Sequence, residues 1–217
     1  SPKCHIVTEK HIEEDSNNNK STSRGIAPCY RDKFFRTGVR VEEDEFFKDY
    51  IWDEKLNGNV LCEGAQGFWL DVDQGNYPYV TSSTTLPYGC CSLGFPPQKI
   101  REIYGAAKFY DTRVGFDPLF PETLLDDPEK KKVIKVGKEF GVTTGKMRKV
   151  DWLNFDKLVE SINLSGTTVV IISKKDILET TGFYKLYYNN NLVTFKDMKQ
   201  MTYFLTQKLN NLCPQLR

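Results

Sequence analysis

Three stretches of this sequence concentrate glycine, hydroxyl and charged residues, the groups that proteins use to bind phosphates and carboxylates. They cover positions 21–38, 63–85 and 139–149. Backbone amides next to glycine, hydroxyls and cations can together hold the oxygens of an anion, and arginine can do so with two parallel charge-assisted bonds. Each stretch also has a plainer interpretation: a polar loop with surface arginines, a capped hairpin and an exposed turn, respectively.

The second and third stretches carry the more specific chemistry. Gln66 stands between small residues after an apolar triplet, and a run of hydroxyl residues follows at 81–85. In the third stretch, a pair of threonines flanked by glycines precedes Lys146, Arg148 and Lys149. This density of amides, hydroxyls and cations suits a carboxylate or a phosphate.

The elements that must position these stretches follow from the hydrophobic patterns. We expect an exposed polar loop at 13–20, a short helix at 46–56, a buried strand at 60–62 and a helix at 99–110. Further along, the patterns predict a helix at 155–162, a strand covered on both faces at 167–173, a strand at 184–188 and a last helix that begins near Thr194 and Asp197. A helix followed by a buried strand indicates a mostly parallel central sheet flanked by helices. We therefore expect one α/β domain over 1–217.

Composition excludes several classes of protein. Hydrophobic residues make up 39% and charged residues 27%, as in ordinary globular proteins. With 30 Lys and Arg against 29 Asp and Glu, the net charge of +1 provides no basic field for nucleic acid. No apolar run approaches the roughly 20 residues that span a bilayer. The six cysteines lack metal-site spacing, which favours reduced thiols in a cytoplasm, the host's if the protein is viral.

Five motifs, in order, resemble the adenylosuccinate synthetase family, and together they reach over nearly all of the chain beyond position 20. They are Arg24-Gly25-Ile26-x-Pro28-x-Tyr30-x-Asp32-Lys33, Glu63-Gly64-Ala65-Gln66-Gly67, Tyr77-Pro78-Tyr79-Val80-Thr81-Ser82-Ser83, Thr112-Arg113-Val114-Gly115 and Glu139-Phe140-Gly141-x-Thr143-Thr144-Gly145. The resemblance implies a P-loop-NTPase-like ligase fold, truncated here at its N-terminal side.

The resemblance also implies roles for single residues. Contacts to a purine monophosphate would come from Thr22, Arg36, Gln66, Leu70, Val80, Thr81 and Val114. Arg36 would be donated across a homodimer interface, and Gln66 would stand at the purine 6-oxygen. The aspartate-binding loop would contain Val142, Thr143, Thr144 and Arg148. Lys174 and Asp176 would recognise the base of the phosphate-donating nucleotide.

The reaction implied by the family joins L-aspartate to the 6-position of a purine monophosphate through a 6-phosphoryl intermediate, with Mg²⁺ offsetting the phosphate charge. The family's glycine-rich phosphate loop, its catalytic base and the paired acid match nothing here, and we expect them in a preceding segment. We assign no metal ligand to this chain. His5 and His11 match no catalytic motif, so surface or packing roles are expected for both.

Departures from the family pattern favour one branch. Lys146 replaces the arginine that contacts the ribose 2′-hydroxyl in the common enzyme, and lysine cannot reproduce that planar fork. Thr112 to Glu122 and Arg148 to Asn154 look more like the phage branch, which joins aspartate to dGMP with ATP or dATP as donor. Asp176 favours a guanine donor instead, as in the ordinary enzyme that uses IMP and GTP. A non-catalytic nucleotide-binding or dimerisation fragment is a third alternative.

Overall fold

The computed structural model describes residues 1–17, 23–52, 54, 56–141 and 145–217. Contacts between residues divide the chain into two units, Ser1–Lys99 and Ile100–Arg217. That 1–217 forms one domain stays a prediction.

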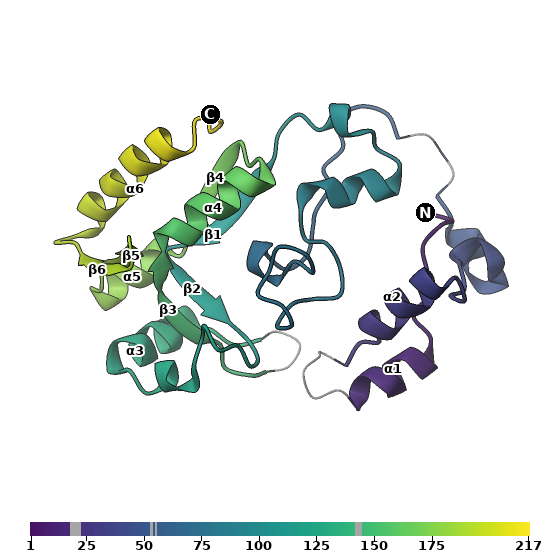
Figure 1. The fold of residues 1–217 in the computed structure, drawn as a ribbon, viewed down its shortest axis with the longest axis horizontal. Helices are drawn as coiled ribbons and strands as arrows, with labels where there is room; N and C mark the ends of the chain where they lie inside the picture. Colours follow the sequence, from purple (N-terminus) through teal and green to yellow (C-terminus); the bar gives the residue numbers. More distant parts are fainter. Residues whose placement is uncertain (18–22, 53, 55, 142–144) are drawn as a thin grey trace. The chain divides into compact units, whose positions relative to one another are not determined.

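Two helices open the first unit, α1 (Glu9–Ser16) and α2 (Ile26–Phe35), drawn at the purple end of the ribbon in Figure 1. A capping box begins α1: the backbone N–H of Thr8 donates to Nδ1 of His11 at 3.0 Å, and the N–H of His11 donates to the Thr8 hydroxyl. The other ring nitrogen of His11 lies 3.1 Å from Asp32 in α2. His11 is therefore a packing residue that joins the two helices.

The N-terminal helix α1 extends into the segment that the sequence predicts to be a loop. The sequence predicts an exposed loop from position 13, but α1 continues to Ser16 because its cap and its buried Asp15 hold the turn together. Oδ2 of Asp15 accepts the backbone N–H of Gly25 at 2.9 Å. Gly25 has φ +73°, and a Cβ there would lie 2.9 Å from the backbone of His11, so only glycine fits.

The rest of the first unit is built from turns and short 3₁₀ helices: η1 (Val41–Glu43), η2 (Glu45–Tyr50), η3 (Phe68–Leu70), η4 (Pro87–Leu93) and η5 (Pro97–Lys99). The helix predicted at 46–56 is thus reduced to η2. The buried strand predicted at 60–62 is wrong, since Leu61 is 87% exposed and no strand is formed there. Strands need partners, and every paired strand in the described part of the chain belongs to the second unit.

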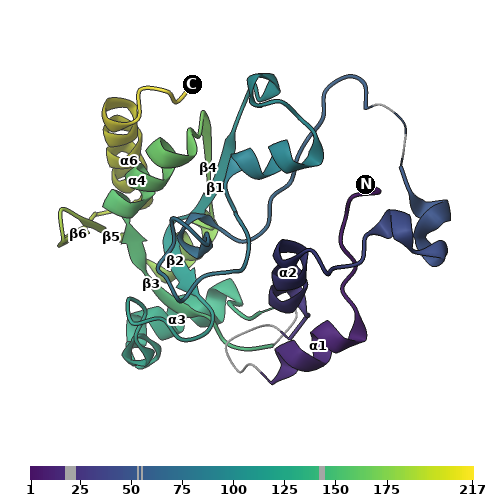
Figure 2. The same ribbon diagram turned by 45° about the vertical axis from the view of Figure 1, so that its right-hand side comes forward.

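The second unit contains two small sheets. The parallel pair consists of β1 (Tyr104–Lys108) and β4 (Val169–Ser173). The other sheet has the order β2-β3-β5-β6, formed by β2 (Tyr110–Arg113), β3 (Lys149–Asn154), β5 (Lys185–Tyr188) and β6 (Asn191–Thr194). β3 and β5 are parallel, and the outer pairs are antiparallel. Helices connect and cover these strands, as Figure 2 shows, and the α/β class is confirmed.

The helix predicted at 99–110 is wrong. This segment forms β1 and the start of β2 instead. Alanine and glycine let β1 approach its neighbours closely: a Cβ on Gly105 would lie 2.9 Å from the Thr167 side chain. Pairing with β4 therefore outweighs the helical preference of the local sequence. The strand at 167–173 is confirmed as β4, but Ile171 is 53% exposed, so the expected coverage of both faces is not found.

The described residues of the second unit also form the short 3₁₀ helix η6 (Glu122–Leu125) and the helices α3 (Pro128–Gly137), α4 (Phe155–Ser165), α5 (Lys175–Thr181) and α6 (Met198–Leu212). The predicted helix at 155–162 is confirmed as α4. Asp197 caps α6 by accepting the N–H of Gln200 at 2.8 Å, as its place near the predicted start suggests. Phe155, Leu186, Met201 and Leu205 lie in one continuous core, so the apolar stripe of α6 packs as expected.

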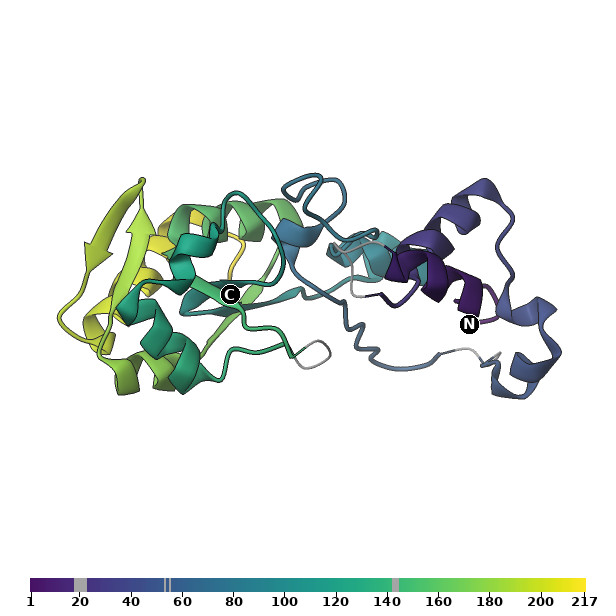
Figure 3. The ribbon, with the colours of Figure 1, turned by 90° about the horizontal axis from the view of Figure 1, so that it is seen from below.

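A tight hairpin joins β5 to β6, visible at the yellow-green end of the sheet in Figure 3. Asn189 and Asn190 both adopt positive φ, 49° and 59°, which matches the right-handed twist of the strands. Across the described residues, no helix has the length and apolarity that a membrane crossing requires. All six cysteines are free thiols.

Candidate functional site

A buried carboxylate organises the second of the three polar stretches. The side chain of Asp71 is fully buried. Its Oδ1 accepts the backbone N–H groups of Asp73 and Gln74 at 3.0 Å each. Its Oδ2 accepts the hydroxyl of Thr84 at 3.0 Å and the N–H of Thr85 at 2.6 Å. Burial by itself would raise the pKa of Asp71, but these four donors outweigh it and lower the pKa below its ordinary value.

This arrangement brings together three residues that the sequence predicts as nucleotide contacts. The N–H of Thr81 donates to the carbonyl of Leu70 at 2.8 Å. Val80 packs on Gly75, where a Cβ would lie 2.8 Å from the valine and 2.5 Å from the carbonyl of Asp71. Leu70, Val80 and Thr81 are all half-buried and lie on one folded turn.

Gln66 lies at the entrance of the same turn. It is exposed and has φ +61°, an unusual conformation for a residue with a side chain. The neighbouring carbonyl of Gly67 accepts the Thr85 hydroxyl at 3.0 Å, which ties this end of the loop to the Asp71 network. A strained, exposed amide on an otherwise fixed loop is a common feature of binding sites.

The first polar stretch places Arg36 at the end of α2. Arg36 has φ +66°, its backbone N–H donates to the carbonyl of Lys33 at 3.2 Å, and its side chain is exposed. Thr22, the other predicted contact from this stretch, lies outside the described residues.

In the second unit, Val114 follows β2 directly and is 40% exposed. The residue before it, Arg113, pairs with the buried Asp117 at 3.2 Å. This ion pair fixes the bend at Gly115, which has φ +81°. The arrangement presents Val114 at the surface, directly after the end of β2.

The third stretch forms a hairpin whose ends are held together. The N–H of Gly141 donates to the carbonyl of Lys146 at 2.8 Å, and the N–H of Arg148 donates to the carbonyl of Glu139 at 2.9 Å. Phe140 and Met147 form an isolated antiparallel bridge. Val142, Thr143 and Thr144, the other predicted aspartate contacts, lie outside the described residues.

Beneath this hairpin, Glu139 is 1% exposed and accepts hydrogen bonds from three side chains. Nζ of Lys108 lies 3.0 Å from Oε1, the Tyr110 hydroxyl lies 2.7 Å from the same oxygen, and Nη1 of Arg148 lies 2.9 Å from Oε2. Lys108 also donates to the hydroxyl of Thr112 at 3.1 Å.

These bonds decide the charge of Glu139. Burial would raise its pKa, but the donors Tyr110, Arg148 and Lys108 outweigh burial and lower the pKa. The closeness of the cluster depends on Gly137, where a Cβ would lie 2.7 Å from the Tyr110 hydroxyl. Glu139 is therefore an ionised carboxylate at neutral pH.

The predicted donor-base residues border the same region. Lys174 has φ +68° at the start of α5, and its Nζ lies 3.4 Å from the carbonyl of Gly137. Asp176 follows in the first turn of α5 and is exposed. The charge of Asp176 contributes to the raised pKa of Tyr110, after burial and Glu139.

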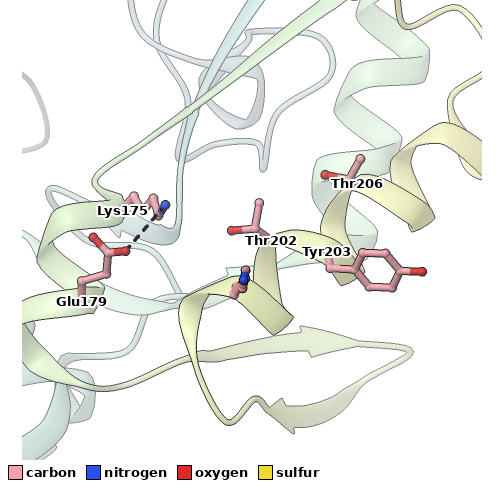
Figure 4. A pocket seen from close by; sticks show the side chains of 6 residues that line it. Lys175, Glu179, Thr202, Tyr203 and Thr206 are labelled. Atoms are coloured by element: carbon pink, nitrogen blue, oxygen red, sulfur yellow. Dashed lines mark ion pairs between the residues drawn. The ribbon is translucent and has the colours of Figure 1, made fainter.

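A groove of about 510 Å³ lies between α5 and α6. Figure 4 shows Lys175 and Glu179 on one side of it, 3.6 Å apart, with Thr202, Tyr203 and Thr206 on the other. Neither Lys174 nor Asp176 lines this groove. It is a separate hollow from the predicted donor-base site.

Within the described ranges, no three side chains of His, Cys, Asp or Glu come together as a metal site. The sequence patterns do not indicate the roles of Asp71, Lys108, Tyr110 and Glu139. Two of these lie inside the quoted stretches, but their burial depends on distant partners. The other two lie in the segment that was mistaken for a helix.

Known proteins resemble this chain in sequence and in fold. The family model of adenylosuccinate synthetase matches residues 44–188. The adenylosuccinate synthetase of Thermodesulfovibrio yellowstonii is 35% identical over an alignment that covers 84% of this chain and 56% of the relative. The Caenorhabditis briggsae enzyme is 34% identical and covers 83% and 55%, respectively. The chain thus spans about half the length of the curated relatives it matches.

Two solved structures share the fold. The fully ligated adenylosuccinate synthetase of Plasmodium falciparum has a TM-score of 0.74 at 24% identity and covers 93% of this chain and 63% of its own. The succinoaminodeoxyadenylate synthetase of cyanophage S-2L, bound to dGMP and dATP, has a TM-score of 0.61 at 17% identity and covers 94% and 70%.

Proposed function

Because the chain belongs to the adenylosuccinate synthetase family, we propose that the protein containing it is a carbon-nitrogen ligase that joins L-aspartate to the 6-position of a purine monophosphate. The family match over residues 44–188 carries this proposal. The folded turn that carries Leu70, Val80 and Thr81 and the partly exposed Arg148 support it, since the reaction needs one site for a nucleotide and another for a dicarboxylic amino acid.

In this reaction the purine 6-oxygen receives a phosphoryl group from a nucleoside triphosphate, and the aspartate amine then displaces that phosphate. Gln66 is proposed to donate its amide N–H to the 6-oxygen as negative charge develops there. Leu70, Val80, Thr81 and Val114 are proposed to contact the nucleotide, and Thr22 and Arg36 its phosphate. Mg²⁺, when bound, would offset the charge of the gathered phosphates.

Arg36 is proposed to reach the site of a partner subunit in a homodimer. Its exposed position at the end of α2 supports this role, because a side chain that serves another protomer must lie on the surface. Arg148, with Val142, Thr143 and Thr144, is proposed to bind the amino acid, and Lys174 and Asp176 the base of the phosphate donor.

For the nucleotide, we propose dGMP, with ATP or dATP as donor, in the cytoplasm of the cell or of a virus-infected host. Lys146 supports the deoxynucleotide because it replaces a planar arginine fork with a flexible point charge. The similarity of fold to the cyanophage enzyme, whose structure holds dGMP and dATP, is consistent with this substrate.

A second candidate is the ordinary reaction of IMP with GTP. Asp176 favours it, since an exposed carboxylate can accept two donors from a guanine edge and faces adenine N1 poorly.

The test uses the natural full-length protein, with aspartate and each pairing of dGMP or IMP with ATP, dATP or GTP. Phosphate release and the mass of the product are measured. We expect a succinylated product from dGMP. A preference for IMP would support the second candidate, and no succinylated product with either nucleotide would contradict the ligase proposal.

A further inference from the structure

The cluster around Glu139 places two cations on one buried carboxylate. Lys108 and Arg148 both pair with Glu139, and the charges of Asp111 and Asp176 act on the same cluster. The charge of Lys174 also acts on Lys108, and burial, Arg148 and Lys174 together lower the pKa of Lys108 against the opposing effect of Glu139. Both cations therefore depend on one buried carboxylate for their position.

Burying a carboxylate in this way is costly for the fold alone. Replacing a buried ion pair with apolar side chains of similar size is often neutral or stabilising, so stability does not explain why such a cluster is kept. The Glu139 carboxylate fixes the positions of two cationic groups. It accepts hydrogen bonds from Nζ of Lys108, in β1, and from Nη1 of Arg148, at the end of the hairpin.

Arg148 has donors to spare after this bond. A guanidinium has five N–H donors, and the ion pair with Glu139 is formed by Nη1. The Arg148 side chain is 30% exposed, while that of Glu139 is 1% exposed. Nη1 is therefore anchored on a buried carboxylate, while part of the Arg148 side chain is exposed.

We propose that Glu139 is a positioning residue for the amino-acid substrate: it anchors Arg148, and with it Lys108, so that the guanidinium meets the aspartate carboxylate in a fixed orientation. This inference rests on the proposed ligase function and on the placement of Arg148 in its amino-acid site. The Tyr110 hydroxyl supports the same carboxylate but brings no charge to the ligand.

The decisive variant is Glu139→Gln in the full-length protein. The amide keeps one acceptor oxygen and replaces the other with an NH₂ donor, so this side chain can no longer hold both Lys108 and Arg148, while every ligand donor is kept. We expect the KM for aspartate to rise about ten-fold or more, with the KM values for both nucleotides and kcat within about three-fold of wild type. Binding of aspartate, measured by calorimetry in the presence of the purine monophosphate, should weaken in parallel. Glu139→Asp keeps the charge and should recover part of the affinity.

Two controls separate positioning from general loss of structure. Glu122→Gln removes a carboxylate that pairs at 2.8 Å with Lys149, the residue next to Arg148, and should leave the KM for aspartate unchanged. Tyr110→Phe removes a buried donor to Glu139 and should lower thermal stability, with a much smaller effect on that KM than Glu139→Gln.

An unchanged aspartate KM in Glu139→Gln, or an equal rise in Tyr110→Phe, would overturn the positioning role. If Glu139→Gln does not fold, Glu139→Asp carries the test, since the shorter side chain displaces Arg148 and should still raise the KM for aspartate selectively. Failure of the wild-type protein to form any succinylated product would contradict the proposed function instead, so the two failures are distinguishable.

Discussion

Asp111 in β2 and Asp151 in β3 stand directly opposite each other across an antiparallel pair. Burial raises the pKa of Asp111 to about 6, and the charge of Asp151 adds to this effect, while the N–H of Asn154 opposes it at 2.9 Å. Asp151 has a cation of its own, Lys130, at 3.0 Å. Asp111 is therefore the member of the pair whose ionised form is disfavoured in the folded protein.

The first prediction concerns pH and stability. An unfolded Asp titrates near 3.8, so between about pH 4 and 6 the folded protein keeps a proton that the unfolded chain has lost, and stability falls as pH rises. Asp111→Asn removes this cost. We expect it to raise the free energy of unfolding at pH 7.5 by about 1 to 3 kcal/mol and to give no gain at pH 3.5. Denaturant unfolding at both values measures this, with the exposed Asp126→Asn as control. Equal gains at the two pH values would contradict the assignment.

The second prediction concerns the turn built on Asp71. Asp71→Asn replaces one of two acceptor oxygens with a donor that faces other donors, which should cost about 2 to 4 kcal/mol of local stability. We expect faster amide exchange over residues 67–86 and weaker binding of the purine monophosphate. Asp73→Asn, an exposed neighbour, serves as the control. Unaltered exchange in the Asp71 variant would show that the turn holds without its central acceptor.

The third prediction addresses the sugar. Lys146 is exposed in the structure. Lys146→Arg should shift kcat/KM toward ribonucleotides by about ten-fold, because an arginine donor that the bound nucleotide covers and leaves without a 2′-hydroxyl costs roughly 1 to 3 kcal/mol. The comparison is GMP against dGMP in both proteins, so that only the sugar differs. An unchanged ratio of kcat/KM for GMP to kcat/KM for dGMP would show that Lys146 does not recognise the sugar, and would contradict its use as support for the deoxynucleotide.

The fourth prediction concerns the proposed homodimer. Arg36→Ala should cost about 2 to 5 kcal/mol of transition-state or phosphate binding. Mixing this variant with one disabled at Gln66 should restore part of the activity, since hybrid dimers regain one intact composite site. Subunit exchange is demonstrated first by mass spectrometry of differently tagged chains. A mixture that exchanges subunits and stays inactive would rule out a shared site.

Local sequence predicts those elements whose pattern and packing agree. Helix α4 and the start of α6 are examples, since their apolar stripes face one core. The pattern at 99–110 predicts a helix because apolar residues such as Ile100, Ile103 and Ala107 would lie on one side of it, and only pairing with the distant β4 makes 104–108 a strand. The β5–β6 hairpin was predicted only in its first strand, although the asparagine run at 189–191 is a turn signal.

In the candidate site, too, some residues can be predicted from local sequence and others cannot. Gln66, Arg148 and Lys174 could be named because they lie in motifs that resemble a family. The supporting carboxylates Asp71 and Glu139 could not be recognised as such, because their significance lies in burial and in donors that include residues as far as 31 positions away. Periodicity and spacing contain no information on such partners.

The parallel pairing of β1 with β4 also sets an order of events in folding. Its first contacts join Ile103 to Thr168, 65 positions apart, so this pair forms only after a long loop has closed. The β5–β6 hairpin closes over two residues and carries no such entropic delay. The β1–β4 pair therefore closes a much longer loop than the hairpin does. Until it assembles, the backbone N–H and C=O groups of both strands are unpaired and can associate with strands of other chains.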